Sequence, residues 1–156
     1  MKKIKISGIR QVTNLSQVEV FSRPARLANP FQILTLLGEN GINLEFIVIH
    51  GQTDETLDLI FGVKRNSIAA TLGLLRGMEK KFGMEEVRSQ DGVGMVSLFP
   101  HRNQATVIEN FFTAFQEAGI KLLSISFSLA AISGLIEENL IPDAVNALSA
   151  YFELPG

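Results

Sequence analysis

The stretch that decides the fold is Leu36–Leu44, LLGENGINL, because Ala114–Leu122, AFQEAGIKL, repeats its pattern. In both stretches a helical pattern ends at Gly-Ile and a strand-like run begins, and from residue 41 to residue 119 the offset is 78. An apolar stripe with the spacing of a helix precedes each glycine, formed by Ile33, Leu34 and Leu37 in one copy and by Phe111, Phe112 and Phe115 in the other. The chain is therefore predicted to contain two copies of one small unit.

The rest of the chain continues the repeat. Each copy is expected to run strand, strand, helix, strand, strand, helix, with strands near 3–9, 18–21, 46–49 and 57–63, and again near 85–89, 93–99, 124–127 and 130–136. The second helices are expected at 68–82 and 141–152, with Ser67 as N-cap, Gly83 as stop and Pro142 in a first turn. Gly92–Gly94 is interpreted as a turn. Residues 51–55 are expected to form a long, polar hairpin in the first copy, whereas a tight connection is expected between the corresponding strands of the second copy.

This order matches the ferredoxin-like βαββαβ motif, an α+β fold with antiparallel sheets and helices on one face. Such a unit needs a strand after its second helix. In the first copy residues 85–89 supply it, but no comparable run follows the last helix. We therefore expect units at 12–90 and 91–156, the second completed by a strand at 3–10.

The composition of the chain argues against several classes of function. The 156 residues include 14 basic and 16 acidic ones, a net charge of −2, which argues against a nucleic-acid binder. Cysteine is absent, and the two histidines lie far apart in sequence, so neither a metal site nor a cofactor is predicted. The apolar runs are interrupted and shorter than a membrane span, so the cytosol is the expected compartment. Units this small would be marginal alone and should pack together or form an oligomer.

The repeated order, the Gly41-Ile42-Asn43 helix end and the run Glu45–Val48 resemble ACT domains, and the arrangement resembles the paired regulatory region, or small regulatory subunit, of aspartate kinases. The resemblance covers nearly the whole chain. It implies a module that binds an amino-acid effector at an interface between ACT units, a homodimer, and an enzyme of amino-acid metabolism as the regulated partner. No kinase region is present in the sequence.

Several positions depart from the family pattern. The Pro-Gly of the loop before the first helix falls at Leu27-Ala28 in one copy and at Ala105-Thr106 in the other. The acidic residue of that loop becomes Ala25 and Asn103. The asparagine after Gly-Ile is kept at Asn43 but becomes Lys121, and a polar position late in the second strand is Ile49.

The candidate effector site follows from what an amino acid needs. Its carboxylate suits the backbone N–H groups at a helix N-terminus, and its ammonium group suits oxygen atoms such as those of Glu45. The first-copy set comprises Arg26, Ala28, Asn29, Pro30, Phe31, Asn43, Leu44, Glu45 and Ile47. The second-copy set comprises Asn103, Gln104, Ala105, Thr106, Val107, Lys121 and Leu122. The alternative is that both loops are simply solvated and that Asn43 and Glu45 only follow a helix stop.

Three functions remain open. The first is a regulatory module that senses an amino acid. The second is an assembly module that has lost its effector, which the altered loops favour. The third, an enzyme, lacks any recognisable catalytic motif, since neither a Gly-x-Ser-x-Gly elbow nor a phosphate-binding lysine loop occurs in the sequence.

Overall fold

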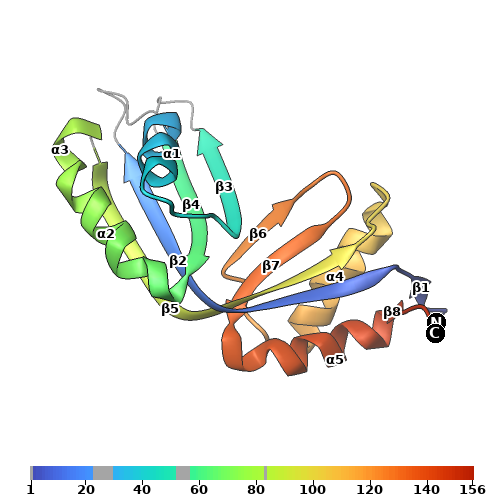
Figure 1. Cartoon of the computed structure of the whole chain (residues 1–156). Coiled ribbons are helices and arrows are strands. Elements are labelled where there is room, and N and C mark those ends of the chain that lie inside the picture. Colours follow the sequence, from blue (N-terminus) through green and yellow to red (C-terminus); the bar gives the residue numbers. More distant parts are fainter. Residues whose placement is uncertain (1, 23–29, 52–56, 83) are drawn as a thin grey trace. The chain divides into compact units, whose positions relative to one another are not determined.

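The computed structural model describes residues 2–22, 30–51, 57–82 and 84–156. The chain divides into two compact units. The central unit is Leu15–Asp91, and the terminal unit combines the chain up to Asn14 with Gly92–Gly156. Two long strands, β2 (Gly8–Ser22) and β5 (Met84–Phe99), contribute to both units. Both chain termini belong to the terminal unit (Figure 1).

The central unit has the strand order β3-β4-β2-β5. Strand β4 pairs antiparallel with β3 and with β2, so that β3 lies at an edge. Besides β2 and β5, its elements are α1 (Pro30–Glu39), β3 (Phe46–Gly51), β4 (Leu57–Lys64), the 3-10 turn η2 (Arg65–Ser67), α2 (Ile68–Gly77) and α3 (Glu79–Phe82).

The terminal unit has the strand order β2-β5-β7-β6, and β7 pairs antiparallel with β5 and with β6. A separate two-stranded sheet joins β1 (Ile4–Lys5) in parallel to β8 (Phe152–Glu153). The remaining elements are α4 (Ala105–Glu117), β6 (Ser124–Phe127), β7 (Ile132–Glu137), the 3-10 turn η3 (Glu138–Leu140) and α5 (Ile141–Tyr151). The predicted α+β class with antiparallel sheets is confirmed.

Each unit has its own core, built from alternate strand residues and the apolar stripes of its helices. Period-two strands turn one face toward the helices, and the stripes at spacing three and four cover it. The central core contains Val18, Val20, Ile33, Leu37, Leu59, Phe61, Val63 and Leu75. The terminal core includes Val96, Leu98, Phe111, Phe115, Ile132, Ile136, Ile141 and Leu148. The helices therefore pack on one face of the strands of their own unit.

The two stretches that define the repeat end their helices in the same way. In the central unit the Ile42 N–H donates to the Leu37 carbonyl at 2.9 Å and the Gly41 N–H donates to the Gly38 carbonyl at 3.1 Å, with Gly41 at φ 69°. This pair of hydrogen bonds is a Schellman motif, which needs a left-handed residue that glycine adopts without strain.

The terminal unit repeats the motif. The Ile120 N–H donates to the Phe115 carbonyl at 2.9 Å, the Gly119 N–H donates to the Gln116 carbonyl at 3.1 Å, and Gly119 has φ 66°. Ile120 is buried in the terminal core, and Ile42 packs against the central one. Each Gly-Ile pair therefore both stops a helix and anchors the segment that leads into the next strand.

The turn predicted at Gly92–Gly94 is wrong, because β5 continues through it. Gly92 is in the left-handed region at φ 66°, and a Cβ on Gly94 would lie 3.1 Å from the Val12 carbonyl oxygen and against Cδ1 of Ile141. These glycines therefore allow a local change of strand direction and a close approach of neighbours, respectively.

Other local predictions are partly wrong. The helix predicted at 68–82 is interrupted at Met78. Ser67 is the N-cap of α2, as predicted, but it makes no side-chain cap hydrogen bond. The strand predicted at 3–9 is divided between β1 and the start of β2. Pro142 in the first turn of α5 is confirmed. The short connection between β6 and β7 is confirmed too. Residues 52–55 of the longer hairpin predicted at 51–55 lie outside the described residues, as does Gly83.

Candidate functional site

The predicted effector residues of the central unit are only partly described. Arg26, Ala28 and Asn29 lie outside the described residues, and Pro30 and Phe31 are described only as the first backbone residues of α1. Of the remaining members, Asn43, Leu44 and Glu45 lie in the connection between α1 and β3. Ile47 is the second residue of β3.

The segment from Asn43 to Ile47 is well anchored through its backbone. The Glu45 N–H donates to the Gly62 carbonyl at 2.9 Å, which joins the segment to β4. Leu44 packs against the central core, Asn43 is exposed and the Glu45 side chain is half-buried. Of these residues, Asn43 and Glu45 offer polar side-chain atoms to a ligand.

Asn43 and Glu45 lie beyond the C-terminal end of α1, whereas the other half of the predicted site is at the N-terminal end of this helix. Asn43 follows the C-terminal end of α1, and a helix of 10 residues is about 15 Å long. Strand β3 then runs back along the sheet edge, with Ile47 and Ile49 exposed at 37% and 43%. The described part of one central unit therefore does not bring the two halves of the predicted site together.

The second predicted set lies at the start of α4. Asn103 has a left-handed backbone at φ 55°, and Gln104 is the N-cap without a side-chain cap hydrogen bond. Val107 is buried in the terminal core, and its N–H donates to the Gln104 carbonyl at 3.0 Å. Ala105 and Thr106 are exposed. Val107 therefore offers a ligand neither its side chain nor its N–H group.

Lys121 and Leu122, the other members of this set, follow the far end of α4. The helix has 13 residues and is about 20 Å long, so these two are remote from Gln104. Lys121 is exposed, whereas Leu122 packs against the terminal core beside Gly134. The second set therefore resembles the first in being divided between the two ends of one helix.

His101 organises the loop before α4, a role that the sequence did not indicate. Its ring is 4% exposed, its Nδ1 accepts a hydrogen bond from the Asn103 N–H at 3.0 Å, and its Nε2 lies 2.9 Å from the Ser128 carbonyl oxygen. Because Nδ1 accepts, the proton is on Nε2, which donates to Ser128. The His101 N–H donates to the Ala130 carbonyl at 2.9 Å. His101 thus ties the loop to the β6–β7 connection.

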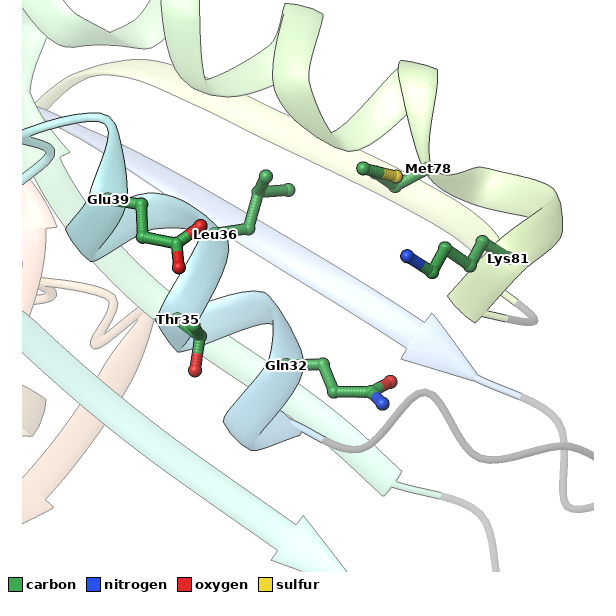
Figure 2. A pocket seen from close by; sticks show the side chains of 6 residues that line it. All are labelled: Gln32, Thr35, Leu36, Glu39, Met78 and Lys81. Atoms are coloured by element: carbon green, nitrogen blue, oxygen red, sulfur yellow. The ribbon is translucent and has the colours of Figure 1, made fainter.

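Three hollows in the described part of the chain are lined by residues other than the predicted effector residues. One of about 240 Å³ lies between α1 and the α2–α3 segment and is lined by Gln32, Thr35, Leu36, Glu39, Met78 and Lys81 (Figure 2). A second, of about 160 Å³, is lined by Gln17, Glu19, Arg88, Ser89 and Gln90. Near it, Arg88 forms a bidentate pair with Glu86 at 2.7 and 3.0 Å, and this pair raises the pKa of Arg88.

The third hollow, of about 380 Å³, lies between α4 and α5. The hydroxyl of Tyr151 donates to Oε2 of Glu117 at 2.5 Å beside it, and this hydrogen bond raises the pKa of Tyr151. The described residues contain no group of three or more potential metal ligands. None of the described helices is long and apolar enough to cross a membrane.

Comparison with known proteins finds aspartokinases along the whole chain, although no protein-family model matches it. An aspartokinase of Bacillus sp. strain MGA3 is 26% identical, and an aspartate kinase of Pseudomonas fluorescens is 30% identical; each alignment covers 99% of this chain. The chain spans only 38% of the length of either relative.

The solved structures that this chain resembles are also aspartokinases or their subunits. The crystal structure of aspartokinase alpha and beta subunits is 26% identical, with a TM-score of 0.82 over 94% of this chain and 97% of that one. The ligand-free regulatory subunit of aspartate kinase from Thermus thermophilus is 20% identical, with a TM-score of 0.83, and the match covers 95% of this chain and 99% of that one. E. coli aspartokinase III in complex with lysine and aspartate is 13% identical, with a TM-score of 0.70 over 95% of this chain and 33% of that one.

At these identities the Thermus and E. coli likenesses show the fold, whereas the sequence matches extend over the whole chain. Together they establish that this chain is similar, from end to end, to aspartokinases, and in its fold to the regulatory subunit of aspartate kinase.

Proposed function

We propose that this chain is a non-catalytic regulatory module that binds a small amino acid at an interface between ACT units and acts on an aspartate-kinase-like enzyme. The observation that carries the proposal is the likeness in fold to the regulatory subunit of aspartate kinase from Thermus thermophilus, with a TM-score of 0.83 over 95% of this chain. A related fold was solved in complex with lysine and aspartate. The cytosol is the compartment that we expect for such a module.

The geometry of the central unit supports an effector site shared between two copies. Strand β3 is an edge strand with exposed isoleucines at positions 47 and 49, a surface suited to pairing with a second β3. Two copies related by a twofold axis present the same patch to each other. If their β3 strands run antiparallel, the Asn43–Ile47 segment of one copy lies near the start of α1 in its partner. The two halves of the predicted site would then meet across the interface.

Titration calorimetry with single amino acids, lysine first, tests the binding proposal. We expect at least one amino acid to bind, and Asn43→Ala and Glu45→Gln to weaken that binding. The matched controls are Asn146→Ala and Glu109→Gln, which change exposed residues on α5 and α4 and should leave the affinity unchanged. Equal affinities in all four variants would remove Asn43 and Glu45 from the site.

An assembly module that binds no effector is the second candidate. The loops that precede α1 and α4 lack the family's Pro-Gly, and β3 exposes Ile47 and Ile49, which an interface between two copies would cover without any ligand. This function predicts a stable dimer that no amino acid affects.

Light scattering after size exclusion tests the shared interface of both candidates. Ile49→Lys places a charge on the exposed edge of β3 and should convert dimer to monomer. Leu129→Lys is the control, because Leu129 is 97% exposed on the β6–β7 connection of the terminal unit. A wild-type monomer, or a dimer that survives Ile49→Lys, would contradict an interface at β3.

A further inference from the structure

The loop that leads into α4 of the terminal unit contains a strained turn. The Gln104 N–H donates to the His101 carbonyl at 2.9 Å, and the two residues between them, Arg102 and Asn103, have φ angles of 52° and 55°. Positive φ at both central residues is typical of a type I′ turn, which suits glycine and asparagine. Arginine is disfavoured in this left-handed region, so the turn needs support beyond its own backbone hydrogen bond.

The ring of His101 provides this support. Its Nδ1 accepts a hydrogen bond from the Asn103 N–H at 3.0 Å, and its Nε2 donates to the Ser128 carbonyl oxygen at 2.9 Å. His101 is 4% exposed, and its ring lies edge-on to that of Phe127, with the ring centroids 6.3 Å apart. A ring that accepts at one nitrogen and donates at the other is neutral. The neutral ring therefore joins the strained turn to the β6–β7 connection.

A second proton on the ring does not fit this arrangement. In the imidazolium form both nitrogens are donors, so Nδ1 would point its proton at the Asn103 N–H, which would lose its acceptor. The loop also precedes the N-terminus of α4, where the helix dipole disfavours a positive charge. Protonation would thus replace an attractive contact by a repulsive one at a side chain that is almost fully buried.

The charged groups around the ring do not offset this repulsion. The end of β5, strand β6 and residues 128–131 contain no charged side chain, and β7 carries one, Glu137, at its far end. The charged residues next to the loop on other elements are Arg102 in the turn, Glu109 on α4, and Lys5 and Arg10 on either side of the Ser7 N–H that donates to the Phe99 carbonyl. Three of these four are cations. In the described part of the chain, the ring forms no recorded ion pair with Glu109, which is exposed.

We propose that the loop before α4 is a pH-dependent latch: the neutral ring of His101 holds the strained turn against the β6–β7 connection, and protonation of Nδ1 by solvent releases it. Histidine is the residue type that changes its charge near physiological pH. Release frees the Asn103 N–H and lets Arg102 and Asn103 leave the left-handed region. The second predicted effector set begins at Asn103, so the geometry of that set follows the state of the latch. The latch belongs to the terminal unit alone and does not depend on whether an effector binds.

Nitrogen NMR of the two histidine rings tests the latch in the full chain. His50 is exposed on β3 and is the reference, and the His101 signals are assigned by their loss in His101→Asn. At neutral pH we expect His101 to carry its proton on Nε2. As the pH falls, the backbone amide signals of Asn103 and Leu129 should shift together with protonation of this ring, whereas that of the buried Phe61 in the central core should not. A ring that stays neutral until the whole chain unfolds, or an Asn103 signal that does not follow the ring, would overturn the proposal.

Matched variants separate the latch from a general effect of acid. His101→Asn keeps an acceptor in the place of Nδ1 but takes up no proton, so the Asn103 signal should lose its pH dependence. His50→Asn removes the other histidine and should leave that dependence unchanged. The same pH profile of Asn103 in the wild type and in His101→Asn would overturn the latch.

Arg102→Gly tests the part that strain plays. Glycine adopts the left-handed region freely, so this variant stabilises the closed turn and should move the midpoint of the Asn103 transition to lower pH. The exposed Lys121, beyond the far end of α4, provides the control, because Lys121→Gly also removes a cation but should leave the midpoint in place. A midpoint that Arg102→Gly does not lower would overturn the role of the strained turn.

Discussion

Gly41 and Gly119 each combine a left-handed backbone with empty space around the missing side chain. Their φ angles are 69° and 66°, and a Cβ on either would meet nothing within 4 Å. Any cost of a side chain at these positions is therefore conformational and not steric. The Gly-Ile pairs were recognised from the sequence because this requirement is local, which is why the repeat predicted the helix ends well.

Gly41→Ala should lower the free energy of unfolding by about 1 kcal/mol, because an L-residue is disfavoured in the left-handed region. Gly38→Ala, three residues earlier, lies inside α1 with open space around its Cβ and should stabilise by up to about 1 kcal/mol. Chemical denaturation of both variants measures the difference. Equal effects of the same sign would show that the Schellman motif does not govern this helix end.

Gly94→Ala tests a different reason for glycine. Its Cβ would press on the Val12 carbonyl oxygen and on Ile141, so we expect a loss of about 1–3 kcal/mol through overpacking. Ile141→Val shortens the opposing side chain, and the double variant should be less destabilised than the sum of the single ones. Strict additivity in denaturant unfolding would mean that Ile141 does not limit the space.

Among the elements, the long strand β5 shows where single-sequence reasoning fails. The two glycines at 92 and 94 looked like a turn, yet one permits a positive φ and the other a close approach by distant residues. His101 is similar, since its partners Ser128 and Ala130 come from another connection. Long-range contacts of this kind leave no local pattern, whereas the period of the apolar residues predicted the helices and most strands.

The candidate site was predictable only in part for the same reason. The residue types that suit an amino acid were recognised, but the distance between Asn43 and the start of α1 depends on how α1 and β3 run. The hollow between α1 and α3 joins residues about forty positions apart, with no motif to mark it. Both features become visible only once the helices are placed on the strands.

The contact between α4 and α5 predicts a pH effect that one chromophore reports. Tyr151 is the single tyrosine, and tryptophan is absent. Its hydrogen bond to Glu117 holds the pKa above the usual value of about 10. Because the folded-state pKa is raised, this stabilisation is fully present below about pH 10 and is lost as the pH rises through the folded-state pKa.

Absorbance titration of the phenol measures this effect. Glu117→Ala should lower the pKa of Tyr151 toward its usual value, whereas Glu109→Ala, an exposed residue on the same helix, should not change it. A pKa that is the same in the wild type and in Glu117→Ala would show that the hydrogen bond does not form in solution.

At the scale of the whole molecule, the internal repeat and the likeness to aspartokinases both support the proposed regulatory function. The chain is similar to those relatives along its entire length, and its fold is similar to that of a regulatory subunit of aspartate kinase over 95% of the chain. Regulation by an effector requires different affinities for two states of the assembly. The limits of the two ACT units, 12–90 and 91–156 with 3–10, remain a prediction.

The most direct test of the regulatory account is thermal unfolding of the full chain with each proteinogenic amino acid in turn. A ligand at one hundred times its dissociation constant adds about 2.7 kcal/mol to the folded state. For a chain of this size, that corresponds to a rise of about 5–10 °C in the midpoint. The account predicts such a rise with at least one amino acid. No rise with any amino acid at saturating concentration would contradict it and would leave an assembly module that binds no effector.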